Sequence, residues 1–137
     1  EIDYKNGDIF FRAISGKTSD GLLNVSVPLG AGIVGRVCDT QKTEVLSKMK
    51  DNSVHLKNIG MLVGFDARDV IASPVVIRGV TFGCIELLNR SGSDKYSQSD
   101  IEILEAICGY AAKVVENRLV MAELYRRFEP ETVKQAA

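Results

Sequence analysis

Residues that build metal centres and disulfide frameworks are scarce in this 137-residue sequence, which has three cysteines and one histidine. Cys38, Cys84 and Cys108 show no C-x-x-C pairing, so they indicate neither a zinc site nor a disulfide framework. We expect these cysteines to be buried and reduced in a cytoplasmic protein. His55 is expected to be a partly exposed helix residue, with a lone haem ligand as the alternative. The sequence therefore predicts no metal site.

The sequence has no large excess of basic over acidic residues or the reverse, and it has no long apolar run. Seventeen Lys and Arg against eighteen Asp and Glu give a net charge of −1, which excludes nucleic-acid binding driven by bulk charge. The longest apolar run, Val70 to Ile77, is interrupted by Ser73 and Pro74 and is too short to span a bilayer. No signal peptide is recognisable. We expect neither nucleic acid nor a membrane as a partner of this segment.

The sequence does have enough apolar material for one folded domain. Hydrophobic residues make up 45% and charged residues 26%, a balance typical of a globular domain with its own core. The sequence starts at Glu1 rather than at Met, which indicates an excerpt of a longer protein.

Motifs for catalysis are as scarce as metal ligands. No P-loop, nucleophile elbow or catalytic pair of carboxylates occurs. Gly30, Gly32 and Gly35 do match G-x-G-x-x-G, with Asp51 about twenty residues further on. However, the helix predicted after this motif is only about ten residues long, and the later strands meet through a tight turn as antiparallel strands do. We favour the interpretation that the glycines let a helix start approach the sheet closely, and we predict no catalytic residue.

Five segments have the pattern of β-strands. Alternating or β-branched apolar residues mark residues 7–15, 24–29, 43–46, 70–77 and 80–88. A turn at Asn6-Gly7 is expected to pair the first of these segments with residues 2–4. Only Arg78-Gly79 separates the last two segments, which predicts a hairpin near the middle of a sheet.

Two segments have a clear apolar period of a helix, residues 31–40 and residues 98–127. Residues 48–64 are irregular but have apolar residues at helical spacing, namely Leu56, Ile59, Leu62 and Val63. The first has one apolar stripe, formed by Ile33, Val34, Val37 and Cys38. Before the second, Ser97 is predicted to be the N-cap, with Asp100 as its capping-box partner. Pro130 is expected to end this helix.

The second predicted helix is longer than a domain of this size needs. Its first half has a wide apolar arc, from Ile101 to Val115, which suits packing against a sheet. Further along, one seam at heptad spacing persists: Ile107, Tyr110, Val114, Asn117, Met121, Leu124 and Phe128. A polar Asn117 within such a seam is typical of parallel coiled coils. We predict dimerisation through this helix, the alternative being a helix that only covers its own sheet.

Glu86 is a charged residue within the apolar strand Phe82 to Leu88. A charge at such a position is costly unless it is paired or faces a polar cavity. Two interpretations remain open. Either alternation turns Glu86 toward solvent, or its carboxylate faces a ligand pocket.

In their order along the chain, these motifs resemble the GAF sensory domains. The resemblance extends from Gly7 to about Leu124 and rests on VPLGAGIVGRV, GFDARDVIASPVV, TFGCIELLNR and the Tyr-Ser-Gln-Ser-Asp sequence before the last helix. It implies an α+β, PAS-like fold with a central antiparallel β-sheet flanked by helices and a long C-terminal helix. The GAF domain would occupy residues 1–127, without the family's first helix and most of its first strand. Residues 128–137 would begin a linker to an output domain.

The resemblance also implies a ligand pocket, on the face of the sheet opposite the dimer helices. Carried over by position, its lining would be Ser15, Ile33, Val34, Leu56, Gly60, Val63, Ala67 and Glu86. Cyclic AMP or cyclic GMP is a candidate ligand because Glu86 agrees with the polar positions of nucleotide-binding members, and backbone N–H groups at a helix start could hold the phosphate. Gly60, Val63 and Ala67 make this pocket more apolar than theirs.

The cyclic-nucleotide-binding members have an Asn-Lys…Phe-x-x-x-Asp-Glu signature, which here is degenerate. Asn89 is kept, Arg90 replaces the Lys and Tyr96 replaces the Phe. Asp100 is also kept, but Ile101 stands where the Glu is expected. The resemblance implies a structural clasp in which Arg90 pairs with Asp100 below the pocket, rather than a ligand contact.

With no catalytic motif, the resemblance predicts a non-catalytic, small-molecule-sensing regulatory domain of a larger signalling protein, which forms a homodimer. Residues 124–133 resemble the linker that precedes the catalytic domain of class III nucleotide cyclases. The methionine-sulfoxide-reductase members need cysteines that are absent between Asp39 and Gly83. The alternative function is a ligand-free dimerisation scaffold whose own side chains, such as Val63 and Ala67, fill the pocket. No cofactor is expected in either case.

Overall fold

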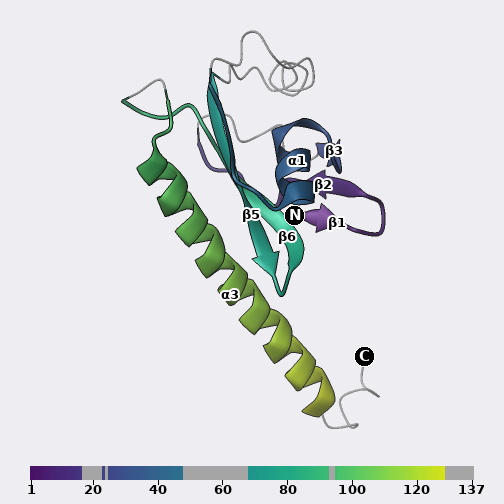
Figure 1. The fold of residues 1–137 in the computed structure, drawn as a ribbon. Helices are drawn as coiled ribbons and strands as arrows, with labels where there is room; N and C mark the ends of the chain where they lie inside the picture. The colour runs from purple at the N-terminus through teal and green to yellow at the C-terminus, as the bar shows by residue number, and fades with distance from the viewer. Residues whose placement is uncertain (17–22, 24, 48–67, 93–94, 129–137) are drawn as a thin grey trace.

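The computed structural model describes residues 1–16, 23, 25–47, 68–92 and 95–128. Its strands are β1 (Ile2–Asp3), β2 (Asp8–Phe10), β3 (Ser26–Pro28), β4 (Glu44–Ser47), β5 (Asp69–Ile77) and β6 (Val80–Leu88), and its helices are α1 (Gly32–Thr40) and α3 (Gln98–Phe128). The strands form antiparallel pairs, and the long helix lies at the C-terminal end (Figure 1). The predicted α+β class is confirmed.

The β5–β6 hairpin lies between α1 and α3 (Figure 1). Its register runs from Val70 opposite Leu88 to Ile77 opposite Val80, with an irregularity between Val75 and Val76. The connecting residues Arg78 and Gly79 have φ values of 51° and 82°, as a tight two-residue hairpin turn requires. The predicted hairpin is therefore confirmed.

The described strands form two three-stranded sheets, β1-β2-β3 and β4-β5-β6, rather than the single central sheet that we expected. The two sheets adjoin where β1 lies beside β6. A Cβ added to Gly83 would lie 3.0 Å from the Cα of Glu1, and the Tyr4 hydroxyl donates to the carbonyl of Thr81 at 2.6 Å.

The N-terminal strands are shorter than predicted. The turn at Asn6-Gly7 does pair β1 with β2, but β2 ends at Phe10 and residues 11–16 are irregular. The strand expected at residues 24–29 is reduced to β3. The strands are short because β3 pairs only with the three residues of β2. An extended segment beyond these pairs would leave its backbone N–H and C=O groups without hydrogen bonds.

Helix α1 places its apolar stripe inward, as predicted. Ile33, Val34, Val37 and Cys38 are all buried. The glycine motif has a different role from the expected approach to the sheet. A Cβ on Gly35 would lie 2.6 Å from the backbone carbon of Gly30, so the glycine lets α1 pack against the turn that precedes it.

Helix α3 begins with the predicted capping box. The Ser97 N–H donates to Asp100 Oδ2 at 2.7 Å, and the Asp100 N–H donates back to Ser97 Oγ at 3.3 Å. The first half of α3 packs on the sheet through Leu104, Cys108 and Ala112. The second half continues beyond the hairpin (Figure 1). No described helix has the length and apolar content that crossing a bilayer requires.

The β4-β5-β6 sheet separates two apolar clusters. On the α1 face, the buried members are Ile2, Ile9, Ile33, Val34, Val37, Cys38, Val70 and Ala72. On the α3 face, they are Ile71, Val75, Leu104, Cys108 and Ala112. Both faces of β6 are therefore covered by a helix.

Candidate functional site

Glu86 lies half-buried on the α1 face of the sheet, and its Oε1 atom is buried. Its cross-strand neighbour is Ala72, a member of the α1-face cluster. Cys84 and Leu88, two residues before and after it on β6, pack against the same cluster. Within the part of the chain that the structure describes, Glu86 Oε1 is inaccessible and has no hydrogen-bond partner. The interpretation that alternation turns Glu86 toward solvent is therefore wrong.

Burial changes the acid–base chemistry of Glu86. It raises the pKa of this carboxyl to about 7, because the charged form loses its hydration. Near neutral pH the group is thus close to equally divided between two forms. The acid can donate one hydrogen bond, and the carboxylate can accept hydrogen bonds on both oxygens. A buried polar atom without a partner is unfavourable, so Glu86 is suited to meet a polar group that the described residues do not supply.

The other predicted lining residues have three different placements. Ile33 is 0% and Val34 9% exposed, both within the α1-face cluster. They share a face of the sheet with Glu86 but expose almost no surface. Ser15 is exposed, in the irregular segment after β2. Four predicted lining residues and His55 lie outside the described residues; the four are Leu56, Gly60, Val63 and Ala67.

The residues of the predicted clasp connect the end of β6 to the start of α3. Arg90 Nε lies 2.8 Å from Asp100 Oδ2. The hydrogen bond from Arg90, together with those from Ser97, lowers the pKa of Asp100 to about 2. Tyr96 packs against the α3-face cluster, and burial raises its pKa to about 12. These contacts fix the end of β6 against the start of α3, as the predicted structural clasp requires.

Sequence reasoning missed Asp69 as a member of this clasp. Asp69 is 1% exposed, and its Oδ2 accepts the N–H of Arg90 at 2.9 Å. Its backbone carbonyl accepts the N–H of Asn89 at 2.9 Å. The Asn89 Oδ1 accepts the N–H of Arg68 at 2.7 Å. An aspartate directly before an apolar strand was the available signal, since a buried carboxylate needs such donors.

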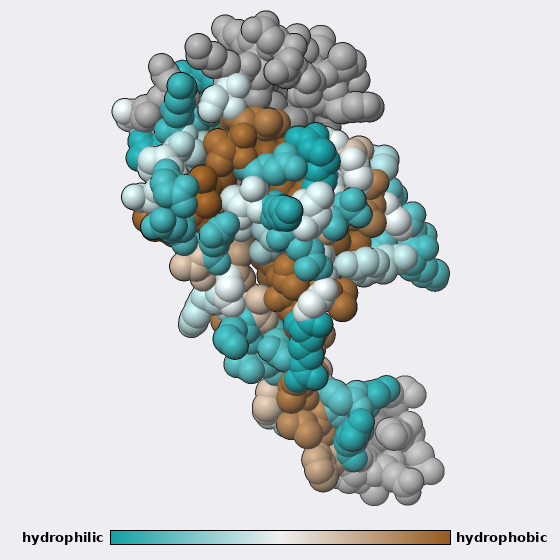
Figure 2. Space-filling model, viewed as in Figure 1, coloured by the Kyte–Doolittle hydropathy of each residue, from teal (hydrophilic) through white to brown (hydrophobic). Residues whose placement is uncertain are grey.

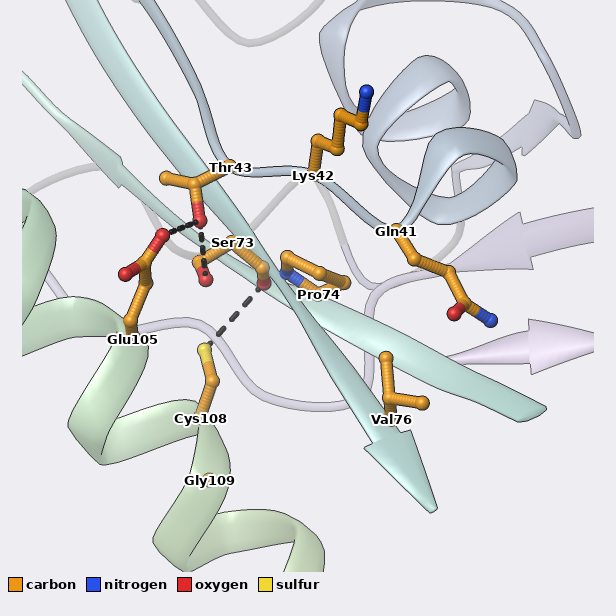
Figure 3. A pocket seen from close by; sticks show the side chains of 9 residues that line it. All are labelled: Gln41, Lys42, Thr43, Ser73, Pro74, Val76, Glu105, Cys108 and Gly109. Carbon is orange, nitrogen blue, oxygen red and sulfur yellow. Dashed lines mark hydrogen bonds between the residues drawn. The ribbon is translucent and has the colours of Figure 1, made fainter. Parts of the chain in front are cut away.

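A hollow of about 510 Å³ lies on the α3 side of the sheet (Figure 3). Its lining is Gln41, Lys42, Thr43, Ser73, Pro74, Val76, Glu105, Cys108 and Gly109. Thr43 Oγ1 lies 3.0 Å from Ser73 Oγ and donates to Glu105 Oε1 at 2.7 Å. Thr43, Ser73 and Glu105 in this hollow thus already pair with one another, and none of the predicted lining residues belongs to it. Its residues come from three distant segments, so no local sequence signal indicated it.

The predicted heptad seam lies on the outside of α3. Its apolar members Ile107, Tyr110, Val114, Met121, Leu124 and Phe128 are between 42% and 80% exposed. Asn117 is exposed as well. An apolar surface is visible along the lower part of the helix (Figure 2). The sheet-facing residues of α3 are other ones, so covering its own sheet does not account for the seam.

Comparison with known sequences gives a family. A model of the GAF domain family matches residues 3–116. The cone cGMP-specific 3',5'-cyclic phosphodiesterase subunit alpha' of Bos taurus is 25% identical over 89 residues, which are 65% of this chain and 10% of that protein. The chain thus spans about a tenth of the length of this curated relative.

Comparison with solved structures gives the same fold at low identity. The GAF domain of an Acinetobacter phosphoenolpyruvate-protein phosphotransferase has a TM-score of 0.69 and 19% identity, covering 89% of this chain and 70% of that one. A type II free methionine-R-sulfoxide reductase from Thermoplasma acidophilum has a TM-score of 0.60 and 17% identity, covering 81% and 72%. The fold is therefore shared with the GAF domain of a larger protein and with a reductase.

Proposed function

This chain belongs to the GAF domain family, and we propose that it is a non-catalytic regulatory domain that binds a small molecule on the α1 face of its β4-β5-β6 sheet. The observation that carries this proposal is Glu86. Its buried Oε1 has no partner among the described residues. Among the described residues, the other buried side-chain nitrogen and oxygen atoms have partners, and an unpartnered atom in such surroundings is characteristic of a functional site.

A purine edge is the ligand chemistry that suits this carboxyl. Guanine presents two neighbouring N–H donors, which match the two oxygens of an ionised Glu86. Adenine presents one amine beside a ring-nitrogen acceptor, which matches the protonated acid. We therefore propose a cyclic nucleotide, with cyclic GMP preferred above the pKa of Glu86. The likeness to a phosphodiesterase subunit named for cGMP supports this choice.

The start of α1 is the proposed site for the phosphate. The first turn of this helix has no acidic residue, and its N-cap, Ala31, makes no side-chain hydrogen bond. The N–H groups of the first turn, with the positive end of the helix dipole, favour an anion there. Ile33 and Val34 would then pack near the ligand from the same helix.

Isothermal titration calorimetry with cyclic GMP and cyclic AMP tests the proposal. We expect Glu86→Gln to weaken cyclic GMP binding about tenfold, because the amide replaces one acceptor by a donor. Glu102→Gln is the matched control, since Glu102 is exposed on α3, and it should bind as the wild type does. Absence of binding by the wild type, or equal binding by Glu86→Gln, would contradict the proposal.

We also propose that the domain forms a homodimer through the heptad seam of α3. The exposure of this seam favours the proposal, because a helix end with no sheet to cover needs another partner for its apolar face. Leu124→Arg should shift the domain toward monomer in sedimentation, whereas Ala122→Arg, which introduces the same side chain at an exposed position of α3 outside the seam, should not. If the Leu124→Arg variant remained a dimer, dimerisation through this seam would be contradicted.

A ligand-free dimerisation scaffold is the second candidate function. The complete burial of Ile33 favours it, because that side chain has no surface left for a ligand. The scaffold predicts that the domain dimerises while neither nucleotide produces heat on titration. It leaves the unpartnered Glu86 without a role.

A further inference from the structure

The hollow of about 510 Å³ lies at an edge of the sheet, beside α3 (Figure 3). The ladder between β4 and β5 ends at the pair Glu44 and Ala72, so β5 from Ser73 onward has no strand on that side among the described residues. Residues 41–43, which precede β4, and the first half of α3 supply the rest of the lining. The volume is in the range of about 300–1,000 Å³ that is typical of small-molecule pockets.

Gly109 keeps this hollow open on the side of α3. Glycine is a poor helix former, yet Gly109 lies in the interior of a 31-residue helix. A Cβ added to it would meet nothing within 4 Å, so packing among the described residues does not require a glycine there. A molecule that approaches the helix closely would require it.

The polar side chains of the hollow form a hydrogen-bond chain with one direction. Thr43 Oγ1 donates to Glu105 Oε1 at 2.7 Å, and a hydroxyl has only one proton to donate. At the 3.0 Å contact between the two hydroxyls, Ser73 is therefore the donor and Thr43 the acceptor. This direction uses both hydroxyl protons, and it leaves a lone pair of Thr43 Oγ1 and the Oε2 atom of Glu105 as acceptors.

The other side chains of the hollow that could donate are directed elsewhere. The Cys108 thiol donates to the carbonyl of Ser73 at 3.5 Å. The amide of Gln41 donates to two oxygens that do not belong to the lining. Lys42 extends away from the other polar side chains (Figure 3). The side chains thus present acceptors and one negative charge to the hollow.

We propose that this hollow is a binding site for a small primary amine in its ammonium form. An ammonium group has three N–H donors and no acceptor, and its charge complements the carboxylate of Glu105 in a charge-assisted hydrogen bond. A short alkyl chain on the amine would pack against Pro74 and Val76 and pass over Gly109. A carboxylate on the same molecule would meet no side-chain donor there, so the site favours amines over amino acids.

This site is separate from the proposed nucleotide site. Glu86 lies on the α1 face, opposite Ala72, and it does not line the hollow. Amine binding therefore stands or fails independently of nucleotide binding.

Two-dimensional ¹H–¹⁵N NMR of the whole chain, titrated with n-butylamine at neutral pH, tests the proposal. We expect saturable shifts of the amide signals of Thr43, Ser73 and Gly109. The Kd should be on the order of millimolar, because the probe has few atoms. n-Butanol has the same alkyl chain without the charge, and it should bind about tenfold more weakly.

Two variants locate the site. Glu105→Gln should weaken n-butylamine binding about fivefold, since the amide keeps an oxygen for Thr43 but loses the charge. Glu102→Gln makes the same change at an exposed position of α3 outside the hollow, and it should bind as the wild type does. Gly109→Leu should fill the hollow and abolish binding without loss of stability. Ala106→Leu places the same side chain at an exposed position outside the hollow and should leave binding unchanged.

Three results would overturn the proposal. They are the absence of a saturable shift in the wild type, equal affinities for n-butanol and n-butylamine, and n-butylamine binding by Gly109→Leu with the affinity of the wild type. The spectrum of each variant also reports whether it is folded. If a variant does not fold, the comparison of the two probes on the wild type decides the outcome.

Discussion

The two faces of the β4-β5-β6 sheet differ in whether their buried polar side chains have hydrogen-bond partners. On the α3 face, Leu104 and Cys108 fill the core, and the Cys108 thiol donates to a backbone carbonyl. On the α1 face, the Oε1 atom of Glu86 is buried and has no hydrogen-bond partner among the described residues. The α3 face satisfies its polar groups and serves stability. The α1 face has a carboxyl group that can still form a hydrogen bond, and we assign this face to function.

The largest effect on stability is expected from truncating a core side chain on the α3 face. Leu104 is 1% exposed, so Leu104→Ala should lower the free energy of unfolding by about 3 kcal/mol through lost burial and the cavity left behind. The adjacent Ile103 is 60% exposed, and Ile103→Ala should cost less than about 1 kcal/mol. Urea unfolding of both variants measures the contrast. Equal losses would contradict the assignment of Leu104 to the core.

The pH dependence of the free energy of unfolding tests the burial of Glu86 on the α1 face. The folded pKa of Glu86 is about 7, above the unfolded value of 4.5, so the folded state binds more protons between these two values. The contribution of Glu86 to the unfolding free energy should therefore fall as pH rises through this window, by on the order of 3 kcal/mol. It should stay level above the window. Glu86→Gln should remove this slope, and the difference between the two urea-unfolding profiles isolates it. Parallel profiles would show that Glu86 is not buried as described.

A smaller effect is expected where α1 meets its preceding turn. Gly35→Ala would bring a Cβ to 2.6 Å from the backbone of Gly30, which should cost about 2 kcal/mol because backbone must move. A Cβ at Gly109, on α3, would meet nothing within 4 Å. Gly109→Ala should instead stabilise by up to about 1 kcal/mol through helix propensity. Thermal unfolding separates the two, and a neutral Gly35→Ala would contradict this packing.

Local patterns in the sequence were enough for most of the fold. The period of the apolar residues located α1 and α3, β-branched runs located β5 and β6, and Ser97 with Asp100 marked the start of α3. The extent of β2 could not be predicted, because it depends on pairing with the short β3. Whether one sheet or two would form depends on the same distant contacts.

The candidate site was less predictable, for a physical reason. Alternation assigns Glu86 to one face of β6, but it identifies the solvent side only when one face is uncovered. Here α1 and α3 cover opposite faces, so both interpretations of Glu86 were open until the structure placed it. In the clasp, the carboxylate of Asp69 accepts a hydrogen bond from the N–H of Arg90, which is far from it in sequence. Spacing alone could not have identified this contact.

The central claim is that Glu86 is a buried carboxyl available to a ligand on the α1 face. Carbon-13 NMR of the Glu86 side-chain carboxyl, assigned by its loss in Glu86→Gln, tests it most directly. In the free domain the signal should titrate with a pKa near 7. Saturating cyclic GMP should lower that pKa, because N–H donors stabilise the ionised form. An ordinary glutamate pKa that no cyclic nucleotide changes would contradict the claim.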